Sequence, residues 1–231
     1  MRTTHRLASR LLATAASVVL LAATSLMASS QAVAGNVSVF VLDRDGKPVI
    51  DAVVILKPAA GGAPRTPLPT SATISQQRML FLPPMTLVPA GGKINFLNND
   101  PWEHHVKATG AGFSSFLLDN STSFEFRMDG KPDGKPGIST EVTVTKPGPI
   151  LLGCHIHGSM RGHAYVTDSP WALITTVEGE APFQDVPNGP ATIRVWHADQ
   201  LIDLPIQTIS VGNALSRIEV KLTVTPRRRR I

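Results

Sequence analysis

The chain has 231 residues, of which 42% are hydrophobic and 17% charged, and its formal net charge at pH 7 is +5. A single cysteine excludes an intramolecular disulfide, and the terminal run Arg227 to Arg230 lacks the interleaved aromatic residues of a nucleic-acid-binding patch. The composition therefore indicates a globular protein that binds no nucleic acid and ends in a short basic tail, residues 227–231.

The first 34 residues have the three-part order of a secretory signal peptide. Three arginines precede an apolar run rich in Ala, Leu and Val, and the run ends at the small-residue pattern Ala32-Val33-Ala34. A transmembrane anchor is the alternative, but the run is short, is interrupted by Thr and Ser, and ends in a cleavage pattern. We therefore predict cleavage after Ala34, a periplasmic or secreted protein, and no stable membrane insertion after cleavage.

The mature chain, residues 35–231, is long enough for one large domain or two small ones. Three of the 22 basic residues and none of the 17 acidic ones lie in the signal, which leaves 19 basic residues against 17 acidic ones. Four of those 19 lie in the tail, so the folded body is slightly acidic.

Short runs rich in Val, Ile, Thr and Phe recur after residue 35, separated by Gly, Pro and Asp, and helical periodicity is hard to find. We predict an all-β protein built from sandwiches. The expected strands lie in residues 36–43, 51–58, 85–89, 93–100, 123–128, 140–146, 164–168, 191–197 and 217–224.

Two compositional breaks, residues 57–73 and 167–171, divide the mature chain. They enclose a block, residues 70–167, of the size of a small Greek-key sandwich. The flanks, residues 35–60 and 168–226, are each too small for a persuasive core alone. We predict that they form one discontinuous sandwich with the block inserted in it. The alternative is that residues 36–56 supply edge strands to the block.

The flanks carry a resemblance of their own. The segment "VFVLDRDGKPVIDAVVILKP" resembles the opening hairpin of carboxypeptidase-regulatory-like or transthyretin-like sandwiches, and "GEAPFQDVPNGPATIRVWH" resembles their continuation. The resemblance implies that the two flanks are halves of one transthyretin-like sandwich.

The stretch "GPILLGCHIHGSMRGHAYV", residues 148–166, concentrates potential metal ligands. Cys154, His157 and Met160 supply a thiolate, an imidazole and a thioether, and one compact turn can bring all three to a point. Copper electron-transfer sites use two imidazoles, a thiolate and a weak axial thioether. The second imidazole must come from the other histidine cluster of the block, His104 or His105. Strand alternation favours His104, because it shares a face with the apolar Val106.

From about Ile74 to Val166 the sequence resembles the cupredoxins, most closely the amicyanin and plastocyanin-like group. "FLPPMTLVPAGGKINFLNNDPWEHHV" is similar to the family's stretch up to the first histidine ligand, and "GCHIHGSMRGHAYV" is similar to its C-terminal ligand loop. The resemblance implies a Greek-key β-sandwich with one type 1 copper ion. The implied metal ligands are His104, Cys154, His157 and Met160.

The sequence departs from the family's pattern at two places near these ligands. His105 stands where the family usually has Asn after the first histidine ligand, and Ile156 stands where it often has Pro. Contacts around the ligands tune the rigidity of the ligand loop and the redox potential, so we expect these two departures to affect both properties. His155 and His163 are expected to be loop residues that the copper site does not need, and His197 a surface or capping residue.

The expected function is that of an exported electron carrier, not an enzyme, that shuttles single electrons between redox partner proteins by cycling Cu(I) and Cu(II). Combination of a cupredoxin with a transthyretin-like flank also resembles bacterial methylamine-utilisation proteins, which implies a redox partner. Two alternatives remain. The first is a binding module, which either binds copper as a chaperone does or docks a partner. The second, less favoured, is a copper oxidase. An oxidase needs histidines on both sides of its cysteine, and Gly153 precedes Cys154.

Overall fold

The computed structural model describes residues 34–112 and 122–227. The predicted signal peptide, apart from its last residue, and most of the basic tail lie outside these ranges. Within them the chain forms 16 β-strands and no helix, which confirms the all-β prediction. Accordingly, this part of the chain offers no helix that could cross a membrane.

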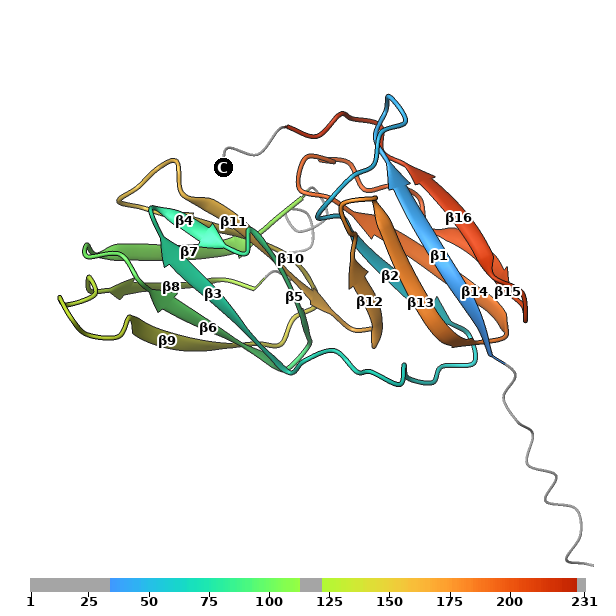
Figure 1. Cartoon of the computed structure of the whole chain (residues 1–231), viewed down its shortest axis with the longest axis horizontal. Coiled ribbons are helices and arrows are strands. Elements are labelled where there is room, and N and C mark those ends of the chain that lie inside the picture. The colour runs from blue at the N-terminus through green and yellow to red at the C-terminus, as the bar shows by residue number, and fades with distance from the viewer. Residues whose placement is uncertain (1–33, 113–121, 228–231) are drawn as a thin grey trace, which may run out of the picture. The chain divides into compact units, whose positions relative to one another are not determined.

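The first sandwich is built from the middle of the chain and packs a five-stranded sheet on a four-stranded one (Figure 1). The larger sheet has the order β5 (Met85–Pro89), β11 (Arg161–Thr167), β10 (Gly148–Cys154), β7 (His104–Gly110), β8 (Phe124–Met128). The smaller sheet has the order β4 (Leu80–Leu82), β3 (Ser71–Gln77), β6 (Gly92–Asn98), β9 (Ile138–Val144). Inward side chains of both sheets form one core, which includes Phe81, Phe96, Val106, Leu152 and Val166.

The second sandwich combines strands from the beginning and the end of the part of the chain that the structure describes. One sheet has the order β13 (Glu180–Pro187), β1 (Ala34–Leu42), β16 (Ser216–Lys221). The other has the order β12 (Trp171–Ile174), β2 (Val53–Pro58), β14 (Gly189–Trp196), β15 (Gln207–Val211). Since β1 is the central strand of its sheet and β2 an inner strand of the other, this sandwich depends on chain segments more than 100 residues apart.

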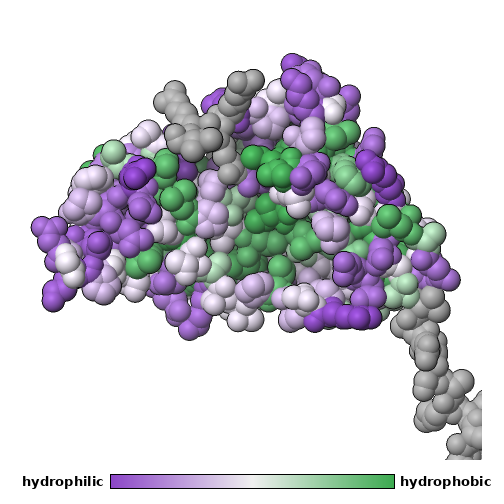
Figure 2. Space-filling model, viewed as in Figure 1, coloured by the Kyte–Doolittle hydropathy of each residue, from purple (hydrophilic) through white to green (hydrophobic). Residues whose placement is uncertain are grey.

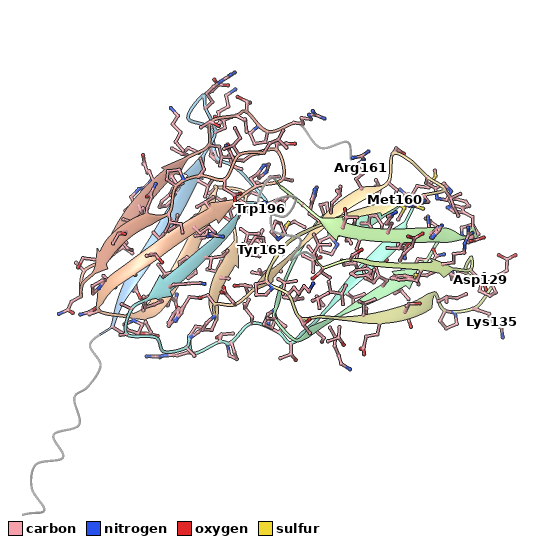
Figure 3. All side chains as sticks on the ribbon, turned by 180° about the vertical axis from the view of Figure 1, so that it is seen from behind. Asp129, Lys135, Met160, Arg161, Tyr165 and Trp196 are labelled. Atoms are coloured by element: carbon pink, nitrogen blue, oxygen red, sulfur yellow. The ribbon has the colours of Figure 1, made fainter. Side chains whose placement is uncertain are left out.

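A third, smaller cluster of buried side chains includes members from strands of both sandwiches. Tyr165 of β11 and Trp196 of β14 have ring centroids 5.8 Å apart, and Figure 3 shows the two side chains together. Val53, Ile55 and Met85 belong to the same cluster. Burial of this apolar surface stabilises the contact between the strands that carry it.

Strand alternation on β7 and β10 determines what reaches the core of the first sandwich. The two strands pair antiparallel, with Cys154 opposite Val106. His104 and Val106 are fully buried and Cys154 is 6% exposed, while His105 between them is only partly buried. A histidine and a cysteine from distant parts of the sequence therefore enter the core side by side.

The architecture predicts that the second sandwich folds without the first. Lys57 and Asp168 form an ion pair of 2.7 Å, and the Ser169 hydroxyl donates to the Leu56 carbonyl at 2.6 Å. The chain therefore leaves the second sandwich and re-enters it at neighbouring positions. Replacing residues 59–167 by a short Gly/Ser linker should leave a protein with dispersed amide NMR signals and cooperative thermal unfolding. Residues 168–227 alone lack β1 and β2 and should remain unfolded; a folded fragment would contradict this account.

Candidate metal centre

A short loop connects β10 to β11 at one end of the first sandwich. It begins after Cys154 and ends at Met160, and the Met160 amide donates to the His157 carbonyl at 2.9 Å. The His155 amide donates to the His105 carbonyl at 3.0 Å, which ties the start of the loop to β7. This turn brings Cys154, His157 and Met160 to the end of the sheet where β7 begins.

Three potential metal-binding atoms meet at this end. The Cys154 Sγ atom lies 3.7 Å from His104 Nδ1 and 3.5 Å from His157 Nδ1, and the two nitrogens lie 3.1 Å apart. At these spacings the point equidistant from all three atoms is about 2.0 Å from each, close to the bonds of about 2.0 Å to nitrogen and 2.3 Å to sulfur in zinc sites. The three atoms can therefore bind one metal ion in a trigonal plane without rearrangement.

Met160 follows His157 closely in the chain, and its side chain faces the core. Only 1% of its surface is exposed, whereas Gly158 and Ser159 just before it are exposed. It belongs to the same core cluster as Cys154, and Figure 3 shows it at the start of β11. Its thioether is thus kept from solvent on the side of the sandwich that also receives the thiol.

Asp100 orients the His104 ring. Its carboxylate lies 2.9 Å from His104 Nε2, and both side chains are almost completely buried. Since an ionised carboxylate can only accept, Nε2 carries the hydrogen and donates it, which leaves the Nδ1 lone pair facing Cys154 and His157. A lone pair facing a second ring nitrogen at 3.1 Å is repulsive unless a proton or a metal ion lies between them.

The same carboxylate supports the turn between β3 and β4. Arg78 and Met79 in this turn have positive φ angles of 54° and 58°, although neither is glycine. Their amides donate to Asp100 at 2.6 and 3.0 Å, which offsets the cost of the backbone conformation. Burial alone would raise the pKa of Asp100, but the hydrogen bonds from Met79, His104 and Arg78 outweigh it and lower the pKa.

The sequence predicted none of these roles for Asp100. The expected strand 93–100 includes Asp100, whereas in the structure β6 ends at Asn98, whose side chain accepts from the Asp100 amide at 3.0 Å. The Asn98 amide group donates to the carbonyls of Trp102 and Asp129, both at 2.9 Å. These contacts hold the loop that leads into β7.

No protein-family model matches the chain, and no curated protein matches it. A solved mutant of amicyanin in its reduced Cu(I) form is 19% identical, with a TM-score of 0.33, over 49% of this chain and 98% of that one. Dithionite-reduced auracyanin from the photosynthetic bacterium Roseiflexus castenholzii is 19% identical, with a TM-score of 0.32, over 46% of this chain and 99% of that one.

His163 lies within β11, so the prediction that it is a loop residue is wrong. It pairs with Leu151 of β10, and its ring centroid lies 5.8 Å from that of Trp196. Burial is the main cause that lowers its pKa to about 4, and nearby His197 lowers it further. His197, expected at the surface or as a cap, is 7% exposed and accepts the Asp199 amide on Nδ1 at 3.1 Å.

Removal of the Asp100 carboxylate should weaken the site and the fold together. Asp100→Ala leaves the His104 ring and two turn amides without their acceptor, which should cost about 2–4 kcal/mol in the free energy of unfolding. It should also lower metal affinity about 10- to 100-fold, because the ring loses its orientation. Urea unfolding and competition with a chelator measure the two effects. Asp133→Asn, at an exposed aspartate, should change neither.

Acidification should destabilise the fold through His163. Because its pKa is lowered from 6.5 to about 4 in the folded protein, the unfolded chain binds the proton more readily between these values. Its contribution to stability is complete above pH 6.5 and is lost as the pH falls toward about 4. His163→Gln should therefore flatten the decline of the unfolding free energy over this range. Equal pH dependence in the variant and the parent would contradict this assignment.

Proposed function

We propose that the protein is an exported electron carrier that holds one type 1 copper ion in the first sandwich. The observation that carries the proposal is the trigonal set of one thiolate and two imidazole donors with spacings of 3.1 to 3.7 Å. Soft thiolate and thioether ligands with imidazole select copper. His104, Cys154, His157 and Met160 would hold the ion.

The bound copper would supply the redox couple Cu(I)/Cu(II), and the protein would hold its ligands nearly fixed in both states. His104 is fixed by Asp100, Cys154 by the pairing of β7 with β10, and His157 by the turn that ends at Met160. His104, Cys154 and Met160 are buried and would keep water from the ion on their side. Both features favour fast electron exchange and disfavour bond-making chemistry, so we infer a carrier and not an enzyme.

We infer that electrons enter and leave through His157. It is the most exposed of the four proposed ligands, and the small residues Gly158 and Ser159 beside it are exposed. Ile156 next to it is 47% exposed, and Trp102 near the start of β7 is 42% exposed. On the face drawn in Figure 2 the surface at the far end of the first sandwich, at the left, is mostly hydrophilic. The redox partner would thus meet a few apolar side chains beside a polar rim.

The proposed location is the periplasm or the extracellular space. Its support is the signal-like order of the first 34 residues. The second sandwich is part of the same proposal as a transthyretin-like module. Its support is the pairing of β1 with β13 and β16 and of β2 with β12 and β14, which joins the two segments that carry that resemblance.

Copper loading tests the carrier function directly. The Cu(II) protein should show intense visible thiolate-to-copper absorption that bleaches reversibly on reduction, together with the matching EPR signal. Cys154→Ser and His104→Ala should lose both. His105→Ala is the matched control and should keep them, because His105 lies on the other face of β7.

Two results would contradict the proposal. If the signal persists in His104→Ala and is lost in His105→Ala, the ligand is His105 and the proposal names the wrong histidine. A colourless protein that binds only Cu(I) and releases it to a competing chelator would favour the alternative, a copper chaperone.

A further inference from the structure

A second cluster of potential metal ligands lies on the outer face of the larger sheet of the first sandwich. It consists of His105 on β7, Glu125 on β8 and His155 just after β10. Their ligand atoms all lie within 4.8 Å of one another, and the two imidazole rings have centroids 4.9 Å apart at an angle of 33°. His105 Nε2 lies 2.7 Å from a Glu125 carboxylate oxygen.

The backbone fixes the positions of these three residues. Glu125 pairs with Lys107, two residues from His105 on the same face of β7, so its side chain reaches His105 diagonally. The hydrogen bond from the His155 amide to the His105 carbonyl holds the two histidines at adjacent backbone positions. The cluster is therefore a consequence of strand register, and it lies at the same end of the sheet as the inner donors.

Each of the three side chains presents a donor atom to the same small region. His105 Nε2 lies against one Glu125 carboxylate oxygen, and Lys107 Nζ lies 3.7 Å from the other. The His155 ring adds a third donor atom beside this pair. Two imidazoles and one carboxylate are a typical ligand set for a divalent transition metal.

We propose that His105, Glu125 and His155 form a second, solvent-accessible site for a divalent first-row metal ion of the Cu²⁺ or Zn²⁺ class. Donor atoms bound to one such ion at about 2.0–2.2 Å lie roughly 3 Å apart. The His105–Glu125 spacing is already of this size. Glu125 and His155 are exposed, so small side-chain rotations bring the third donor into range. Water completes the coordination, because the site faces solvent.

This site is distinct from the inner one, although residues of the two sites are direct neighbours in the sequence. His104 and His105 are neighbours in β7 and point to opposite faces, and so do Cys154 and His155 at the end of β10. An ion at the outer site would be separated from the inner donors by one layer of backbone. The outer ligands contain no sulfur, so they select harder ions than the thiolate and thioether inside.

Calorimetric titration of the full protein with Zn²⁺ tests the proposal. The protein is first given one equivalent of Cu(I) under anaerobic conditions to fill the inner thiolate site. Zn²⁺ should then bind with a stoichiometry of one and shift the ring NMR signals of His105 and His155. His155→Gln and Glu125→Gln should each weaken this binding about tenfold or more.

Glu141→Gln is the matched control, since Glu141 is also an exposed glutamate with a lysine partner, Lys93, at 2.7 Å. It should leave Zn²⁺ binding unchanged. Absence of Zn²⁺ binding, or equal binding in the parent and both cluster variants, would overturn the outer site. If the inner site fails to take Cu(I), Zn²⁺ can occupy both sites. Only the part of the Zn²⁺ binding that Glu125→Gln weakens then reports the outer site. A failure of the inner copper site can therefore be distinguished from a failure of the outer site.

Discussion

The hydrogen bond between the Asp100 carboxylate and His104 Nε2 is the contact on which the rest of the site depends. It joins the loop after β6 to the first residue of β7, and the same carboxylate binds the two amides of the β3–β4 turn. One buried anion therefore stabilises a turn with positive φ angles and sets which nitrogen of His104 faces the thiol. Local backbone strain and the orientation of a proposed metal ligand are coupled through it.

The fold class and the approach of His104 to Cys154 could be predicted from the sequence. Short Val- and Ile-rich runs between Gly and Pro define strands, and alternation on β7 correctly indicates that His104 and Val106 face the core. These features depend on local patterns with a period of two. The identity of His104, Cys154, His157 and Met160 as metal ligands is a proposal that the geometry supports.

Features that depend on packing between distant strands could not be predicted. Asp100 carries no local signal for its bond to the turn amides, because the turn lies about 20 residues earlier in the chain. His163 is expected in a loop from the sequence, whereas its pairing with Leu151 of β10 makes it part of β11. The cluster of His105, Glu125 and His155 likewise requires the register of three strands, which no single segment reveals.

The central claim is that one ion binds the Cys154 thiolate and the two imidazoles of His104 and His157. X-ray absorption spectroscopy at the copper edge of protein loaded with one equivalent of copper tests it most directly. The account predicts one short copper–sulfur distance and two copper–nitrogen distances, nearly equal in the oxidised and reduced protein, because the ligands already surround a common point. A first shell of nitrogen and oxygen only, without sulfur, would contradict it.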